Sequence, residues 1–119
     1  MSAEIIRECF AEAISAAESG DPKFLVTLQS RRDDSVWVQL RWDDINASYP
    51  HSKDPTQLLE SVGISLPEGV TIEAWEANRF VTFEHAAYPT EPLVEFVEAY
   101  FIQVLGLTPS AFTLKITRE

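Results

Sequence analysis

Apolar residues recur every three or four positions in three parts of the chain, which is the spacing of one buried face of an α-helix. The ends of the second part are well marked. Asp54 followed by Pro55 is typical of a helix start, and Gly63 followed by Ile64 is typical of a Schellman ending. Pro89 and Thr90 introduce the third part, and Gly106 ends it. We therefore predict helices over 3–18, 54–63 and 91–105.

Apolar and polar residues alternate in most of the remaining chain, as they do in half-buried strands. The predicted strands are 24–30, 35–42, 44–49, 70–76, 80–85 and 112–117. Consecutive strands with short turns between them must pair antiparallel, because a parallel pair needs a long crossover. The expected fold class is α+β in the order α-β-β-β-α-β-β-α-β. A single domain over 1–119 would have one antiparallel sheet with its helices packed mainly on one face.

The same alternation assigns residues to the second face of this sheet. If Val38 and Leu40 face the helices, Trp37, Gln39 and Arg41 point the other way. For the fifth strand, either Phe80 or the pair Val81 and Phe83 must also point outward. Parity along the neighbouring strands then gives a candidate protein-binding surface: Leu25, Trp37, Gln39, Arg41, Glu73 and Trp75. An exposed aromatic surface of this kind is usually covered, and three covers remain open: the chain's own C-terminal strand or a helix, a homodimer partner, or a client polypeptide.

Charge narrows the possible partners. The 119 residues include 19 acidic and 9 basic side chains, for a formal net charge of −10. This balance argues against nucleic acid and anionic membranes, because phosphate contacts need clustered Lys and Arg. Between Glu68 and Glu98 there are seven glutamates and one basic residue, Arg79. With no apolar run of 18 residues and no signal-peptide pattern, we expect a cytoplasmic protein.

Residues suited to catalysis are few. The single cysteine, Cys9, lies on the apolar stripe of the first helix and is expected to be a buried side chain. His51 and His85 lack any helical or metal-site spacing. The acid pairs 33–34 and 43–44 are adjacent, so each would point to opposite faces of a strand and could not chelate alone. We therefore expect no catalytic residue, no metal and no cofactor.

Two short stretches resemble a known family. Residues 58–67, LLESVGISLP, are similar to its leucine-rich, glycine- and proline-terminated helix signature, with Ile64 where that signature has an aromatic residue. Residues 101–112, FIQVLGLTPSAF, are similar to its glycine–proline–phenylalanine ending. Together with Val38-Gln39, they resemble the bacterial Tir-chaperone/YbjN-like group, related to type III secretion chaperones. The resemblance implies a chaperone-like fold with the last strand as an addition, a tendency to dimerise, and non-catalytic binding of a polypeptide client.

Three hypotheses for function follow. The first is a chaperone- or adaptor-like protein-binding module that acts without catalysis on a basic polypeptide, through the second sheet face and with an exposed strand edge as a further candidate contact. The second is an acidic immunity or inhibitor protein that masks a basic toxin. The third is an enzyme or small-ligand domain that uses His51, His85 and the acidic residues.

Overall fold

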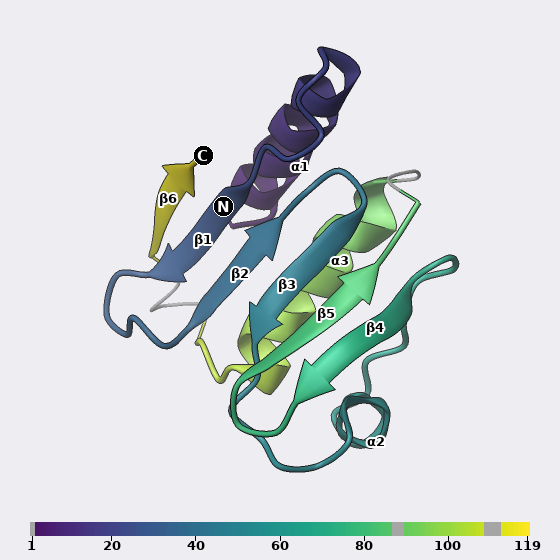
Figure 1. The fold of residues 1–119 in the computed structure, drawn as a ribbon. Coiled ribbons are helices and arrows are strands. Elements are labelled where there is room, and N and C mark those ends of the chain that lie inside the picture. Colours follow the sequence, from purple (N-terminus) through teal and green to yellow (C-terminus); the bar gives the residue numbers. More distant parts are fainter. Residues whose placement is uncertain (1, 87–89, 109–112) are drawn as a thin grey trace.

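The computed structural model describes residues 2–86, 90–108 and 113–119. The elements follow the predicted order (Figure 1). The helices are α1 (Ser2–Glu18), α2 (Pro55–Ser61) and α3 (Thr90–Ala99), which continues into a π-helical turn, η1 (Tyr100–Val104). The strands are β1 (Val26–Ser30), β2 (Trp37–Leu40), β3 (Asp44–Ser48), β4 (Thr71–Glu76), β5 (Phe80–Glu84) and β6 (Leu114–Arg118).

The six strands form one sheet in the order β4-β5-β3-β2-β1-β6, and every neighbouring pair is antiparallel. The predicted α+β class is therefore confirmed. The largest difference in bounds is β2, which is shorter than the predicted 35–42. Two predicted boundary residues, Pro89 and Phe112, lie outside the described residues.

Helices α1 and α3 lie side by side against one face of the sheet (Figure 1). Arg7 of α1 forms an ion pair with Glu91 of α3, so a charged contact joins the two helices at the surface. Beneath them, alternate residues of β1, β2, β3 and β5 point to the helices. The core between the layers includes Phe10, Val26, Leu28, Val38, Leu40, Ile45, Val81, Phe83, Val94, Val97 and Phe101.

The ends of α2 follow the sequence signals closely. The Asp54 side chain accepts a hydrogen bond from the Thr56 backbone N–H at 2.8 Å, which satisfies one free donor of the first turn. At the other end, the Ile64 N–H donates to the Leu59 carbonyl, and the Gly63 N–H donates to the Glu60 carbonyl. These are the two bonds of a Schellman motif, and Gly63 adopts the φ of +79° that the motif requires.

The end of the long third helix departs from the predicted α-helix. The Leu105 N–H donates to the carbonyl of Tyr100, five residues earlier, so the last turn is π-helical. The Tyr100 hydroxyl reaches across the core and donates to the Ser48 carbonyl at 2.7 Å. This bond ties the turn to the end of β3. No helix in the described parts of the chain is long and apolar enough to cross a membrane.

Candidate functional site

The face of the sheet opposite α1 and α3 has no described helix over it, and Figure 1 views the molecule from this side. We call it the open face. β6 lies at the edge of the sheet beside β1, so the C-terminal strand does not cover the face either. Strand register places the side chains of the open face in three rows that run across the strands. The aromatic row is Gln29, Trp37, Ser48 and Phe80, with Lys115 of β6 and Glu76 of β4 at its two ends; the amide row is Thr27, Gln39, Asn46 and Thr82, between Thr117 and Ala74; the charged row is Leu25, Arg41, Asp44 and Glu84, followed by Thr71.

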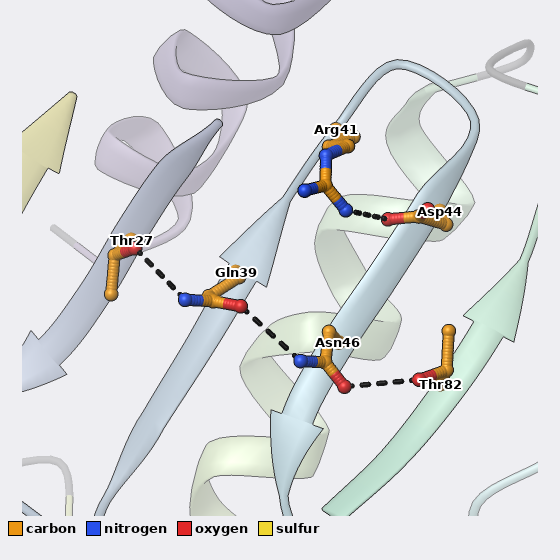
Figure 2. Close-up of polar contacts among 6 residues, drawn as sticks. All are labelled: Thr27, Gln39, Arg41, Asp44, Asn46 and Thr82. Carbon is orange, nitrogen blue, oxygen red and sulfur yellow. Dashed lines mark hydrogen bonds and ion pairs between the residues drawn. The ribbon is translucent and has the colours of Figure 1, made fainter. Parts of the chain in front are cut away.

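The amide row is a continuous chain of hydrogen bonds over four strands (Figure 2). Gln39 Nε2 donates to Thr27 Oγ1 at 3.4 Å, and Asn46 Nδ2 donates to Gln39 Oε1 at 3.2 Å. Thr82 Oγ1 then donates to Asn46 Oδ1 at 3.0 Å. Each amide is held by neighbours on both sides, so the middle of the face is a fixed, uncharged polar strip.

The aromatic row lies on one side of this strip. Trp37 on β2 and Phe80 on β5 flank Ser48, which is only 5% exposed although it is on the open face. The Ser48 hydroxyl accepts from the Trp37 N–H at 3.1 Å and donates to the Trp37 carbonyl at 3.2 Å. These bonds satisfy the serine locally and leave an apolar surface around it. Of the two outward alternatives on β5, the structure selects Phe80, because Val81 and Phe83 are buried in the core.

The charged row lies on the other side of the strip. Arg41 approaches Asp44 with 3.6 Å between Nη1 and Oδ1 (Figure 2). Asp44 pairs in register with Glu84 of β5, and no ion pair links Glu84 to another described residue. Burial raises the pKa of the Asp44 carboxyl, and the charge of Asp43 adds to this rise against the opposing effect of Arg41. The row therefore places two carboxyl groups on adjacent strands beside a single guanidinium.

The structure corrects the predicted position of Trp75. The register of β4 shifts between Ile72 and Ala74, so Ala74 faces Thr82 and Trp75 faces the buried Val81. The Trp75 ring stacks edge-on against the core residue Tyr49, with 6.2 Å between ring centroids. Trp75 is thus on the helix side of the sheet, and Glu73 lies at the irregularity itself. A β-bulge inserts one residue and reverses the parity beyond it, which alternation along the sequence does not reveal.

The other predicted residues come together as expected by parity. Trp37, Gln39 and Arg41 lie on the open face, and Leu25 lies there just before β1, where its carbonyl accepts from the Glu119 N–H. Sequence reasoning missed the contributions of β3 and β5, because strand order decides which residues stand beside Gln39 and Arg41. The available signal was the polar parity of Asp44, Asn46 and Ser48, which alternate with buried neighbours.

The two histidines are not brought together. His51 lies at the η1 end of the molecule, where its Nε2 is 2.8 Å from the Val104 carbonyl oxygen. His85 follows the opposite end of β5, buried against Phe10, and burial lowers the pKa of its imidazole. The length of β5, about 3.3 Å per residue, separates them by roughly 16 Å. Among the described residues, no group of three or more His, Cys, Asp or Glu is placed to hold a metal ion.

Three hollows among the described residues lie away from the open face. Two of them, about 400 and 350 Å³ in volume, flank the segment Gly63–Leu66 between α2 and α3. Cys9 is buried in the core, and burial raises the pKa of its thiol to about 11, so it remains a protonated, inert side chain near neutral pH. The open face is a broad surface with three chemically distinct rows.

Comparison with known proteins gives no relative. The chain matches no family model, no curated protein and no solved structure.

Proposed function

We propose that this protein is a non-catalytic polypeptide-binding module, adaptor- or chaperone-like, that works in the cytoplasm. Its open face receives an extended, basic segment of a partner protein. The observation that carries this proposal is the unbalanced charged row, where Asp44 and Glu84 stand opposite each other beside only Arg41. Like charges opposite each other on neighbouring strands destabilise a sheet, and a cation from a partner would relieve this cost.

The rows define what the partner segment should look like. On β2, Trp37 of the aromatic row and Arg41 of the charged row are four residues apart, or about 13 Å at about 3.3 Å per residue. An extended peptide that lies along the strands presents residues i and i+4 on one side at the same spacing. The matching ligand has an apolar side chain over Trp37 and Phe80 and a Lys or Arg four residues away, near Asp44 and Glu84.

The amide row offers a bound segment polar groups that are held in fixed positions. Gln39 and Asn46 are fixed by hydrogen bonds to their neighbours, so they lose little side-chain freedom when a ligand binds. The aromatic pair Trp37 and Phe80 on one side and the acidic pair Asp44 and Glu84 on the other give the surface a direction. The net charge of −10 supports the same partner chemistry, because it steers the encounter with a basic chain. The resemblance to the Tir-chaperone/YbjN-like group favours the same kind of function.

Affinity capture with matched variants tests the proposal. The immobilised protein is expected to retain basic proteins from a lysate of its native cells, and a Trp37→Ala, Phe80→Ala double variant is expected to lose them. The loss follows because aromatic side chains dominate the energy of binding surfaces, at about 2 kcal/mol or more for each strong anchor. Retention is also expected to fall with added salt, since the charged row is exposed to screening.

Trp75→Ala is the matched control, because it removes an exposed tryptophan from the helix side of the sheet. It is expected to capture the same proteins as the wild type. Identical protein lists from the wild type and the double variant, with both folded by circular dichroism, would rule out the open face as the binding site.

A further inference from the structure

The sheet has two edge strands, β4 and β6, and they differ in how they are protected. Within the described residues, β4 pairs only with β5 and β6 pairs only with β1. β4 carries the bulge between Ile72 and Ala74, with Glu73 at the irregularity and Glu76 at its end. Bulges and charges are common devices that stop an edge from pairing with another strand. The β4 edge is therefore poorly suited to accept a further strand.

β6 has no bulge. Its five residues pair with β1 in an unbroken register from Val26–Arg118 to Ser30–Leu114. The strand contains no proline and no acidic residue, and its charges are Lys115 and Arg118. The Arg118 guanidinium forms an ion pair with Glu12 of α1 at 2.8 Å, so its charge is balanced within each copy.

The direction of the free hydrogen-bonding groups on β6 follows from its contacts to β1. The Arg31 N–H donates to the Thr113 carbonyl, and the Glu119 N–H donates to the Leu25 carbonyl. In an antiparallel pair, hydrogen-bonded and non-hydrogen-bonded positions alternate, so 115 and 117 also point their backbone groups toward β1. The backbone N–H and C=O groups of Leu114, Ile116 and Arg118 consequently point away from the sheet.

We propose that the β6 edge pairs with β6 of a second copy, antiparallel and centred on Ile116, to give a continuous twelve-stranded sheet. In this register Ile116 faces Ile116 of the second copy, and Leu114 faces Arg118 of the second copy. All three outward-pointing residues of each copy are then hydrogen bonded. On the open face, Lys115 stands opposite Thr117 of the second copy, so no like charges meet.

Neighbouring registers are less favourable. A pair centred on Lys115 would place the two lysines opposite each other, and like charges there are destabilising. In a pair centred on Thr117, only two of the three outward-pointing residues, Ile116 and Arg118, would form backbone hydrogen bonds with the second strand. The contact in the preferred register is still small for a protein interface, so we expect reversible dimerisation that depends on concentration.

The two-fold axis of this dimer is perpendicular to the sheet, because Ile116 and its counterpart point to the same face. Both open faces are then on one side of the assembly. A partner with two basic segments could occupy both faces, which raises its overall affinity through effective concentration. The pairing itself does not depend on the proposed function, since it uses the edge and not the open face.

Sedimentation velocity over a concentration series tests the pairing. The wild type is expected to move from 13.4 kDa toward twice that mass as concentration rises from micromolar toward millimolar. Ile116→Lys is expected to weaken association by more than about tenfold, because it places two lysines opposite each other at the centre. Ile116→Pro is a second test: it removes an outward N–H that β1 does not use, so the monomer should keep its fold.

Thr71→Lys is the matched control, since it adds a lysine to the exposed β4 edge and should dimerise like the wild type. Circular dichroism checks that each variant is folded. A wild type that stays at 13.4 kDa at every concentration overturns the proposal, as does a dimer that survives in a folded Ile116→Lys protein. Either result would leave the open-face proposal standing, because the open face binds its segment without the β6 edge.

Discussion

At the scale of single residues, Asp44 is held in a setting that disfavours its charge. Its carboxyl is half-buried on the open face, next in sequence to Asp43 and opposite Glu84. Burial and the charge of Asp43 raise the pKa of Asp44, and the Arg41 guanidinium at 3.6 Å offsets only part of this rise. A residue kept at some cost to stability is what a binding surface for cations is expected to contain.

Asp44→Asn should therefore stabilise the fold at neutral pH. Because the folded-state pKa of Asp44 lies above its ordinary value of 3.8, stability is lost as pH rises from 3.8 through that raised pKa. Asparagine resembles the uncharged carboxyl, so the gain is expected to be on the order of 0.5 kcal/mol at pH 7 and absent at pH 3. Urea unfolding of both proteins at the two pH values measures it.

Asp33→Asn is a control for which we expect the opposite change in stability. Asp33 accepts hydrogen bonds from the hydroxyl and backbone N–H of Ser35, and these lower its pKa. Its charge contributes stability that is present above the ordinary pKa of 3.8 and is lost as pH falls through the lowered value. The substitution should therefore destabilise the protein at pH 7. A loss of stability at pH 7 in Asp44→Asn as well would contradict the account of the charged row.

Trp37 and Trp75 show how far residue positions could be read from the sequence. On β2 the alternation is unbroken, and the outward assignment of Trp37 was correct. On β4 the bulge beside Glu73 turns Trp75 to the opposite face. Both strands alternate in sequence, but a bulge depends on how the neighbouring strand pairs, which one strand's sequence does not contain.

At the scale of elements, α3 is held to the sheet by aromatic contacts. Phe96 stacks edge-on against Phe83 of β5 with 5.0 Å between ring centroids, and its ring lies 6.3 Å from that of Tyr100. Phe83 also contacts Tyr100 at 6.0 Å. The three rings join the helix, the π-helical turn and the strand whose other face carries Phe80 and Thr82.

Phe96→Ala is expected to lower the free energy of unfolding by about 3–4 kcal/mol, because it leaves a cavity in this aromatic cluster. Chemical denaturation measures the change, and Glu95→Ala on the exposed side of α3 is the matched control. A Phe96→Ala protein as stable as the Glu95→Ala protein would mean that α3 does not depend on this cluster.

Helix ends could be predicted from the sequence where neighbouring residues determine them. The start of α2 at Asp54–Pro55 and its end at Gly63 could be predicted, because caps involve residues close together in sequence. The π-helical turn at Tyr100–Val104 could not. It accompanies a hydrogen bond from Tyr100 to Ser48, which is distant in sequence. An apolar spacing of three and four residues does not distinguish the two helix types there.

At the scale of the whole molecule, strand order creates the candidate site. The sequence indicates an antiparallel sheet, but it does not indicate that β5 inserts beside β3 and places Thr82 next to Asn46. That insertion completes the amide row and brings Glu84 opposite Asp44. Two of the acidic residues, whose excess was read first as evidence against nucleic acid, thereby lie together at one side of a defined surface.

The central claim is that the open face binds an extended segment with an apolar and a basic side chain four residues apart. The most direct measurement is an NMR titration of the ¹⁵N-labelled protein with a synthetic peptide of that pattern, and with a matched peptide carrying glutamate in place of lysine. The lysine peptide should shift the signals of the Trp37 indole and of the Gln39 and Asn46 side-chain amides. It should also shift the backbone amide signals around Phe80 and Glu84. The glutamate peptide should shift none of these signals. Shifts confined to α1 and α3, or equal shifts with both peptides, would contradict the account.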